Sequence, residues 1–385
     1  MNLSHPTIAL VAGEASGDQL GGAILSQLRQ HYPQARFVGI GGEQMRSHGM
    51  DTWWDCEELA VFGLFEVLEH FPRLYKIRRK LRQRLLESRP DVFVGIDAPD
   101  FNLGLEISLK SRDISTIQYV SPTVWAWRAK RVRKIARAAD LVLCLFPFEP
   151  DFYRNVGVAA TYVGHPMADR IVNEPDTQPA RDRLGLTSTG KLVALLPGSR
   201  AGEVTKLAGP MIEAARIMAR QQPELRFVSA MANASVRRLF EAELNRPGNP
   251  EVHLVDGRAR DVMAAADVVL VASGTAALET MLVNRPMVVC YQLSAASSAL
   301  IRWFRMMKTE FVSLPNILAG ESLVPELLQK EANSARMAEE VLRWLNDEER
   351  RIALQARFAR LHEQLRCDAG ARAAQAIRSL LERQT

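Results

Sequence analysis

The stretch that decides the fold is Thr7–Leu25, which reads TIALVAGEASGDQLGGAIL. It opens with a short apolar run, continues through a loop rich in small residues at 13–18, and ends in a helical pattern. A second stretch of the same construction, KLVALLPGSRAGEV, runs from Lys191 to Val204. An apolar strand, a glycine loop and a helix in this order open a βαβ unit. The chain is therefore predicted to contain two such openings, one in each half.

Short apolar runs alternate with helical patterns along most of the remaining chain. The runs are almost continuously apolar, as expected of parallel strands that are buried on both faces. We predict an α/β fold with two Rossmann-like, doubly wound parallel sheets. The predicted strands are Ile8–Ala12, Phe37–Ile40, Val92–Ile96, Thr116–Val120, Leu141–Leu145, Leu192–Leu196, Arg226–Ala230, His253–Val255, Val268–Ala272 and Met287–Tyr291. The predicted domains are 1–172 and 191–347, with a polar linker at 173–190 and C-terminal helices at 348–385.

The composition excludes several classes of protein. The chain has 385 residues, of which 47% are hydrophobic and 24% charged, and this balance argues against disorder or a fibrous repeat. The four cysteines are widely spaced without a CxxC pair, so neither a disulfide framework nor a zinc site is expected. No apolar run reaches the ~18 residues of a membrane-spanning helix, and the N-terminus does not resemble a signal peptide. We therefore expect a cytoplasmic protein.

The net charge of +5 is unevenly distributed. Residues 72–89 carry eight basic side chains against a single Glu, and residues 128–137 carry six with no acid. Apolar side chains directly precede the first run, and this pattern is typical of an interfacial anchor on anionic lipid. The alternative is that these apolar residues pack on the first sheet. The predicted anchor consists of Val61, Phe62, Leu64, Phe65, Leu68, Phe71, Arg78, Arg79 and Arg82.

The loop after the first strand is one candidate for a ligand site, because ligands of open α/β sheets bind beyond the carboxyl ends of the strands. Glycine lets a ligand approach the backbone, and the start of the next helix favours phosphate. The alternative is a tight turn in which Ser16 or Asp18 caps that helix. The candidate residues are Gly13, Glu14, Ser16, Gly17 and Asp18.

A second loop, DAPDFN, follows the strand that ends at Ile96. Asp97 lies directly at the strand end and is the better candidate for a general base that accepts a proton from a bound hydroxyl. Asp100 and Asn102 are also candidates for the site, although either could instead cap a helix that begins near Leu103.

Two further segments of the N-terminal half contain aromatic or titratable residues. Trp125 and Trp127 lie in SPTVWAWR after another strand, where they could line a ligand cleft or close the core. His165 lies in the GHP segment, without a neighbouring Cys, His or acid pair that would suggest a metal site. A hydrogen-bonded hinge is the more ordinary role for this histidine.

Two loops of the C-terminal half are typical of diphosphate sites. Gly198, Ser199 and Arg200 combine a glycine loop, a hydroxyl and a guanidinium that matches phosphate oxygens. The segment ASGTAALE places a second such loop before a helix and a carboxylate one turn further on. A carboxylate in that position commonly pairs with ribose hydroxyls. The candidate residues of this second segment are Ser273, Gly274, Thr275 and Glu279.

Several familiar motifs do not occur in the sequence. It contains no Asp-x-Asp, GxSxG or HExxH pattern and no fingerprint of hydride transfer. The basic run at 72–89 lacks the interleaved aromatics of a single-strand nucleic-acid groove. We therefore expect no metal, no cofactor and no nucleic-acid partner.

Seven motifs occur in one order along the chain: GEASGD, IDAPDFN, SPTVWAWR, GHP, LLPGSR, ASGTAALE and VSLPN. In this the whole chain resembles the lipid-A-disaccharide synthases of Gram-negative bacteria. The resemblance implies a GT-B fold and an inverting transfer from UDP-2,3-diacylglucosamine to 2,3-diacylglucosamine 1-phosphate, which yields a β-1,6-linked disaccharide phosphate and UDP. Because both substrates would be lipids held in a bilayer, we expect the predicted anchor to dock the protein on anionic lipids at the cytoplasmic face of the inner membrane. Homo-oligomerisation is left open.

The resemblance assigns roles to the candidate residues. Asp97 would take the proton of the acceptor 6-hydroxyl, and Arg200 would stabilise the departing UDP, with Asn316 and Glu279 on the nucleotide side. The C-terminal helices would cross back to the first domain. The sequence leaves two alternative functions open. One is another GT-B enzyme, either a UDP-sugar epimerase or an N-acetylglucosaminyl transferase of cell-wall synthesis, and the other is a nucleotide-binding or scaffold protein without turnover.

Overall fold

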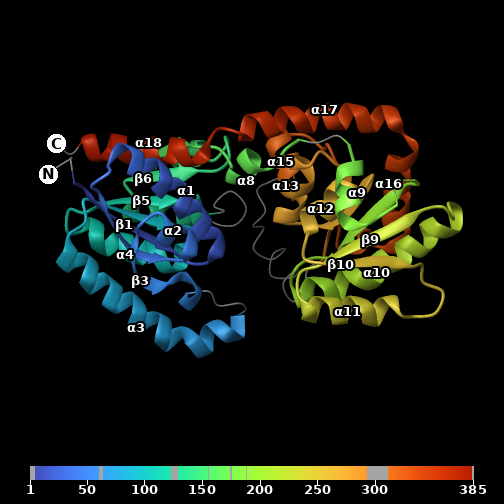
Figure 1. Ribbon diagram of the computed structural model, residues 1–385, viewed down its shortest axis with the longest axis horizontal. Helices are drawn as coiled ribbons and strands as arrows, with labels where there is room; N and C mark the ends of the chain where they lie inside the picture. The colour runs from blue at the N-terminus through green and yellow to red at the C-terminus, as the bar shows by residue number, and fades with distance from the viewer. Residues whose placement is uncertain are drawn as a thin grey trace. The chain divides into compact units, whose positions relative to one another are not determined.

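The computed structural model describes residues 5–59, 64–122, 129–154, 156–173, 176–187, 189–292 and 311–383 (Figure 1). Its contacts divide the chain into two compact units. Unit 1 consists of Met1–Asp169 together with Leu365–Thr385, and unit 2 consists of Arg170–Gln364. Each unit is built around one parallel sheet.

The sheet of unit 1 has seven strands in the order β3-β2-β1-β4-β5-β6-β7, and all of its described pairings are parallel. The central strands β1 and β4 are almost entirely buried, which explains their continuous apolar sequence. The strands are β1 (Thr7–Ala12), β2 (Arg36–Gly41), β3 (Asp51–Asp55), β4 (Val92–Ile96), β5 (Ser115–Tyr119), β6 (Leu141–Cys144) and β7 (Ala159–Tyr162).

The sheet of unit 2 has six strands in the order β10-β9-β8-β11-β12-β13, again with parallel pairings. Its central strands β8 and β11 are fully buried along their length. The strands are β8 (Leu192–Leu196), β9 (Arg226–Met231), β10 (Val252–Asp256), β11 (Val268–Ala272), β12 (Met287–Tyr291) and β13 (Glu326–Leu328). All ten strands expected from the sequence are present, and the prediction of two doubly wound parallel sheets is confirmed.

Helices cover both faces of each sheet. Those of unit 1 are α1 (Ala15–His31), α2 (Glu43–Ser47), α3 (Leu64–Ser88), α4 (Pro99–Lys110), α6 (Ala129–Ala138), α7 (Pro150–Arg154), α8 (Pro166–Arg170) and α18 (Ala369–Glu382), with the short 3₁₀ helix η1 (Cys56–Glu58). Those of unit 2 are α9 (Gln178–Leu184), α10 (Ala201–Gln221), α11 (Ala234–Leu244), α12 (Ala259–Ala265), α13 (Thr275–Leu282), α15 (Leu314–Ala319), α16 (Ser334–Asn346) and α17 (Glu348–Leu365), with η2 (Gln329–Glu331).

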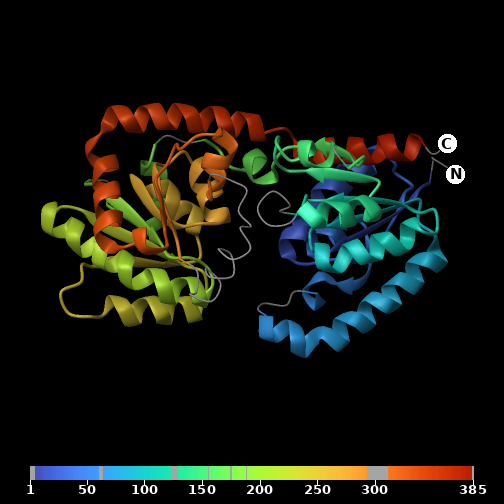
Figure 2. The ribbon, with the colours of Figure 1, turned by 180° about the vertical axis from the view of Figure 1, so that it is seen from behind.

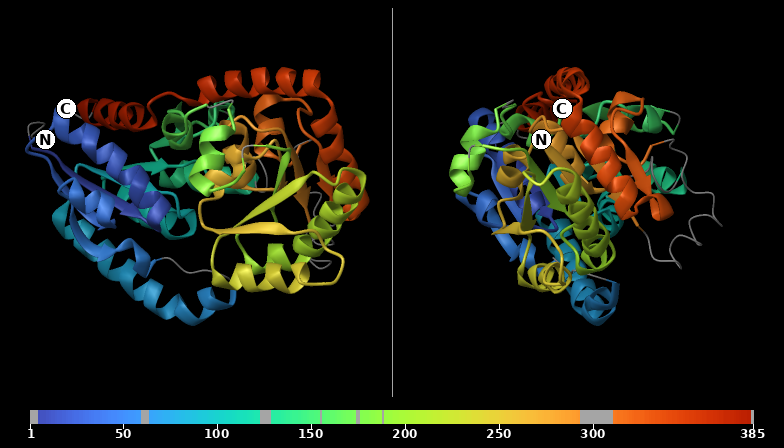
Figure 3. Two further views of the ribbon diagram at one scale, coloured as in Figure 1. Left: turned by 45° about the vertical axis from the view of Figure 1, so that its right-hand side comes forward. Right: turned by 90° about the vertical axis from the view of Figure 1, so that its right-hand side faces the viewer.

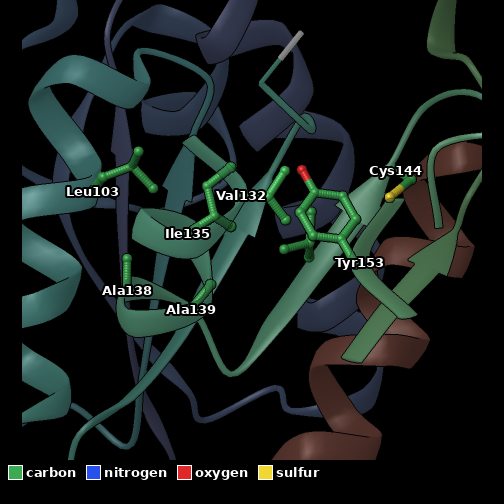
Figure 4. Packing of buried hydrophobic residues seen from close by; sticks show 8 residues of the cluster. Leu103, Val132, Ile135, Ala138, Ala139, Cys144 and Tyr153 are labelled. Carbon is green, nitrogen blue, oxygen red and sulfur yellow. The ribbon is translucent and has the colours of Figure 1, made fainter. Parts of the chain in front are cut away.

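In unit 1, α1 packs with α2 and α18, whereas α4 packs with α3 and α6 on the other face of the sheet. Figures 1 and 2 show α3 as the light-blue helix along the lower edge of this unit. Leu103 of α4 and Val132 and Ile135 of α6 belong to one cluster of buried side chains that also includes Tyr153 and Cys144 (Figure 4). This packing fixes α4, the helix that starts directly after the loop containing Asp97.

The C-terminal helix α18 packs on α1 within unit 1, and Figure 3 shows it in red beside the blue N-terminal segment. Asp169 holds the start of this helix, because its carboxylate accepts from the amides of Cys367, Asp368 and Ala369 at 2.7–3.0 Å. The segment expected to be a polar linker, 173–190, is not a loop that only joins the two units. It contains α9, whose Arg181 is buried and pairs with Asp267 at 2.8 Å, and it belongs to unit 2.

Candidate functional site

Unit 2 contains a cavity of about 480 Å³ at the carboxyl ends of its strands. The loops after β8 and β11 form two of its walls. Seven of the eight residues proposed for the nucleotide side line it, and these are Gly198, Ser199, Arg200, Ser273, Gly274, Thr275 and Glu279. The structure therefore brings together residues that lie about 75 positions apart in the sequence.

Glycines shape both loops of the cavity. Gly198 has a φ of +121° and Gly274 a φ of +155°, and L side chains rarely adopt either value. A side chain at Gly198 would also collide with Glu203. Because of these turns, α10 and α13 begin at the rim of the cavity, where the unpaired amides of a helix start favour an anion. The Ser273 amide is not available to such an anion, since it donates to the Cys290 carbonyl at 2.8 Å.

Charged side chains surround the cavity. The side chain of Arg200 is 85% exposed, and its ion pair with Glu203 is loose at 3.5 Å. Glu279 is half-buried and lies 3.5 Å from Arg260. A ligand can therefore compete for the Arg200 guanidinium at little cost, because an exposed ion pair of this kind contributes little to stability.

A third wall of the cavity, which was not predicted from the sequence, is formed by Gly257, Arg258 and Ala259 after β10. Arg258 has a φ of +51° and precedes α12, while its guanidinium contacts Asp261 and the Arg183 carbonyl. The signal was present in the sequence, since Asp256-Gly-Arg follows a predicted strand as Pro197-Gly-Ser-Arg does. The strand there is only partly apolar, and its end was therefore less conspicuous.

A second cluster lies in unit 1, where the loops after β1 and β4 meet. The two strands are paired in register, with Ala12 opposite Ile96. A side chain at Gly13 would come within 2.6 Å of the Ala98 Cβ, so the loops are in direct contact. Glu14 and Asp97 consequently lie close enough to interact electrostatically. Burial, and then the charge of Glu14, raise the pKa of Asp97 above its ordinary value.

Asp97 stands in a turn with unusual backbone geometry. Its φ is +50° and that of Ala98 is +40°, and non-glycine residues seldom adopt such values. The Asp97 amide donates to the Tyr119 carbonyl at 2.8 Å. Its own carbonyl accepts from the side-chain amides of Asn102 and Gln118 at 3.0 and 3.2 Å. These bonds hold the carboxyl group of Asp97 at the end of the sheet.

Neither Asn102 nor Asp100 is the N-cap residue of α4, which was the alternative role expected for them. Helix α4 begins at Pro99 rather than near Leu103, and its N-cap residue Ala98 has no side-chain cap. Asn102 is fully buried and donates to the Asp97 carbonyl, so it stabilises the loop and does not face a ligand. Asp100 is exposed in the first turn of α4.

The structure corrects the assignment of Asp18 as a ligand-facing residue. Its side chain is only 5% exposed, and its carboxylate accepts from the amides of Gly42, Gln44 and Met45 at 2.7–3.1 Å. Asp18 therefore caps α2, which is neither the expected ligand contact nor the expected cap of its own helix. Gly17 is also buried and allows α1 to pack closely on β1, since a side chain there would approach Ala12 at 3.2 Å. Ser16 is exposed and donates to Glu14 at 2.5 Å.

Asn316 is likewise a structural residue. It is fully buried, and its amide nitrogen donates to the Val324 carbonyl and to Glu326 at 3.0 and 2.9 Å. Its oxygen accepts from the amides of Leu323 and Val324 at 2.9 and 3.0 Å. All four hydrogen-bonding positions of this side chain are used within unit 2, so none is left for a nucleotide.

His165 is buried beside Phe146, with ring centroids 5.3 Å apart. Its Nδ1 accepts from the Met167 amide at 3.2 Å, and its backbone amide donates to the Leu365 carbonyl at 2.9 Å. The ring therefore stabilises the turn that leads into α8.

The remaining predicted residues lie either in α3 or outside the described residues. Trp125, Trp127, Val61 and Phe62 lie outside the described residues. Leu64, Phe65, Leu68 and Phe71 belong to the first turns of α3. Further along α3, Arg79 and Arg82 are exposed, whereas Arg78 packs against Gly104 of α4 and is half-buried. Burial and the neighbouring Arg82 lower the pKa of Arg78.

Within the described ranges, no group of three or more His, Cys, Asp or Glu side chains is arranged to hold a metal ion. The helices in the same part of the chain include none that is both long and apolar enough to cross a bilayer.

Comparison with solved structures identifies the class of this fold. A crystal structure of a UDP-N-acetylglucosamine 2-epimerase homologue from Listeria monocytogenes aligns with a TM-score of 0.63 at 12% identity, covering 98% of this chain and 96% of that one. MurG from Acinetobacter baumannii aligns with a TM-score of 0.59 at 12% identity, covering 97% and 99%. At this identity the likeness concerns the fold alone. Two parallel-sheet Rossmann-like domains of this kind form the GT-B class of glycosyltransferases and epimerases.

Sequence relatives narrow the class to one family. The model of the family described as lipid-A-disaccharide synthetase matches residues 8–377. A lipid-A-disaccharide synthase from Xanthomonas campestris pv. campestris (strain 8004) is 51% identical over 378 residues, which are 98% of this chain and 86% of the relative. One from Xylella fastidiosa (strain M12) is 49% identical over 382 residues, 99% of each chain. The chain belongs to the lipid-A-disaccharide synthase family, whose members are glycosyltransferase enzymes.

Proposed function

We propose that this chain condenses UDP-2,3-diacylglucosamine with 2,3-diacylglucosamine 1-phosphate. The products are the β-1,6-linked disaccharide 1-phosphate and UDP. Family membership over residues 8–377 supports the choice of substrates. The observation that carries the chemistry is the convergence of Arg200 and two glycine-shaped helix starts on one cavity in unit 2.

The donor's diphosphate fits that cavity. A cavity of about 480 Å³ is within the usual range for a small-molecule site. The starts of α10 and α13 supply amide donors, Ser199 and Ser273 line its walls, and Arg200 supplies an exposed cation. These groups would stabilise the charge that builds on UDP as it departs, without a metal ion. Glu279, half-buried on the same wall, would accept from the ribose hydroxyls.

Asp97 is the proposed general base. The acceptor's 6-oxygen forms a bond to the anomeric carbon of the donor while the bond from that carbon to the diphosphate breaks, and UDP leaves with the electron pair. The proton of the 6-hydroxyl passes to the Asp97 carboxylate. A single displacement of this kind inverts the configuration at the anomeric carbon. The raised pKa of Asp97 suits this role, because a carboxylate with a pKa closer to neutral holds the proton more firmly.

Both substrates carry acyl chains, so the enzyme must work at a lipid surface. We propose that α3 and the segment before it dock the protein on anionic lipid at the cytoplasmic face of the inner membrane. Arg79 and Arg82 are exposed and available for this contact, and Tyr75 beside them is 61% exposed.

The direct test is to incubate the purified protein with both acylated substrates and to detect the disaccharide and UDP by mass spectrometry. An acceptor without acyl chains and UDP-N-acetylglucosamine alone serve as controls. We expect product only with both acylated substrates. Epimerisation of UDP-N-acetylglucosamine, or equal turnover of the acceptor without acyl chains, would contradict the proposal.

A further inference from the structure

Unit 1 buries a carboxyl group that the proposed reaction does not use. Glu106 lies on the inner face of α4, its side chain has no exposed surface, and neither of its oxygens has a hydrogen-bond partner among the described residues. An ionised carboxylate in such a place would lose its hydration without compensation, at a cost of several kcal/mol. A buried, unpaired Glu therefore calls for a specific explanation.

Glu106 belongs to a small polar cluster around Gly95 of β4. A side chain at Gly95 would collide with the Glu106 carboxylate oxygen and would lie 2.9 Å from the Asn102 Cβ. Gln118 of β5 is the register partner of Gly95, so its side chain leaves the sheet on the same face. Glu106, Asn102 and Gln118 are all fully buried at this point.

The two amides of the cluster have a defined orientation. The Asn102 nitrogen donates to the carbonyls of Val11, Ile96 and Asp97 at 3.0–3.4 Å. The Gln118 nitrogen donates to those of Asp97, Tyr119 and Val120 at 3.2–3.3 Å. A flipped amide would set its oxygen against carbonyl oxygens, so the oxygens must point away from these partners.

The remaining oxygens of the cluster are all acceptors. Asn102 Oδ1, Gln118 Oε1 and both oxygens of Glu106 are buried and have no partner among the described residues. An ionised Glu106 would add only further acceptors to this group, whereas a protonated one supplies a donor.

The amides restrain the strained turn of the candidate site. Asp97 and Ala98 have positive φ values, and Val120, at the end of the neighbouring strand, has a φ of +72°, which is unfavourable for a β-branched residue. Strain of this kind persists only where the surroundings over-determine the backbone. The Asp97 and Val120 carbonyls are held by Asn102 and Gln118, whose own positions depend on what their oxygens contact.

We propose that Glu106 is a positioning residue for Asp97: its neutral carboxyl group donates a hydrogen bond to the amide oxygen of Asn102 or Gln118 and so locks the turn that presents Asp97. This proposal rests on the role of Asp97 as the general base. Glu106 itself touches neither substrate nor the reacting atoms.

The surroundings of Glu106 favour its neutral form. Lys110, one turn further along α4, is engaged by Asp140 at 2.8 Å and by the Ala139 carbonyl at 3.0 Å. On the other side of α4, Arg78 of α3 packs against Gly104. Burial, and then the charge of Asp140, raise the pKa of Glu106 well above its ordinary value, and Lys110 offsets this only in part.

Two substitutions test whether Glu106 acts as a hydrogen-bond donor or only fills space. Glu106→Gln keeps a donor and cannot ionise, so we expect turnover within about threefold of the wild type. Glu106→Leu has a similar volume and no donor, so the amide oxygens stay unpaired and kcat should fall roughly ten- to a hundredfold with little change in KM. Glu340→Gln is a matched control, because Glu340 is buried in unit 2 and pairs with Arg343 at 3.1 Å; it should leave kcat unchanged. Equal losses for the Gln and Leu variants would overturn the proposal.

A measurement of stability against pH tests whether Glu106 is protonated in the folded protein, independently of any role of Asp97. A carboxyl whose pKa is raised by folding stays protonated while the unfolded chain ionises, so stability falls as the pH rises above the ordinary value of 4.5 and levels off above the folded pKa. The stability advantage of Glu106→Gln over the wild type, measured from urea midpoints, should therefore grow between about pH 5 and pH 8. A difference that does not change with pH would show that Glu106 is not protonated in the folded protein.

A double variant distinguishes the two proposals. If Glu106 acts through Asp97, adding Glu106→Leu to Asp97→Asn should lower turnover no further than Asp97→Asn alone. A full additional loss would overturn the positioning role. Near-normal turnover of Asp97→Asn itself would instead overturn the assignment of the base, while the stability experiment would still report on the proton of Glu106.

Discussion

Asp97 and Glu14 face the same region from two neighbouring strands, and their mutual repulsion is part of what sets the pKa of Asp97. Only one of them stands in a strained turn that other side chains hold in place. This difference in backbone restraint distinguishes Asp97, the candidate base, from Glu14.

Replacing Asp97 by Asn removes the base and keeps the size of the side chain. We expect a loss of turnover of about 10²–10⁴-fold, the usual contribution of a general base, with UDP binding retained in unit 2. Asp100→Asn is the matched control and should have a small effect, because Asp100 is exposed. Assays of both variants decide the matter, and a larger loss for Asp100→Asn would move the role to that residue.

The pH dependence of the wild type follows from the same pKa. The base must be deprotonated, so kcat/KM should fall as the pH drops through the pKa of Asp97, which lies above the ordinary 3.8. The profile is measured with saturating and limiting acceptor. An acid limb that persists unchanged in Asp97→Asn would assign it to another group.

Arg200 should matter for the leaving group more than for the fold. Its side chain is exposed and loosely paired, so Arg200→Ala should leave stability unchanged and lower kcat by about 10²–10³-fold. Arg238→Ala, on the surface of α11 and away from the cavity, is the control and should be active. Excess EDTA should not inhibit the wild type. Inhibition that Mg²⁺ reverses would show that a metal ion neutralises the diphosphate.

At the scale of elements, α3 combines a buried and a basic face. Ile77, Leu81 and Leu85 are buried, whereas Arg79 and Arg82 point to solvent. The buried face explains why the basic run forms one long helix, since its apolar residues recur at helical spacing. The core of unit 1 therefore holds the second half of α3 and leaves its basic side exposed.

The docking proposal is tested on vesicles that contain phosphatidylglycerol. Arg79→Glu with Arg82→Glu should weaken binding by at least tenfold, because each basic residue near an anionic surface contributes about 1 kcal/mol. Salt should weaken wild-type binding by screening. Undiminished binding of the double variant would exclude this face of α3.

The apolar half of the proposed anchor needs a separate variant. Changing Phe62, Phe65 and Leu68 to Ser should abolish vesicle binding and leave a folded protein if these residues meet the lipid. Unfolding or aggregation would assign them to the core instead. Folding is checked by circular dichroism and by retained UDP binding in unit 2.

At the scale of the whole molecule, the central strands could be predicted because their burial on both faces leaves an unbroken apolar run in the sequence. The edge strand β3, Asp51-Thr-Trp-Trp-Asp55, was missed because its residues are exposed or half-buried and it lacks such a run. The three-residue β13 was too short to leave a pattern. Strand ends and glycine loops likewise located both clusters of candidate residues.

Side chains that form hydrogen bonds with backbone groups elsewhere in the chain could not be identified from strand ends and glycine loops. Asp18 caps a helix 24–27 residues further along, and Asn316 is saturated by a segment that begins seven residues away and by Glu326. Nothing in the local sequence distinguishes such a residue from one that faces a ligand. Only the fold shows which polar groups already have partners.

The capture of α18 by Asp169 has a consequence for the order in which the molecule is made. Unit 1 begins the chain, but its last helix is translated only after the whole of unit 2. During synthesis, the surface of α1 that packs against α18 therefore stays exposed to solvent while about two hundred residues of unit 2 are translated. Unit 2 does not depend on a later segment, since it is one continuous stretch of chain and can fold before α18 is translated. Unit 1, whose first segment is translated before unit 2, is thus completed after it.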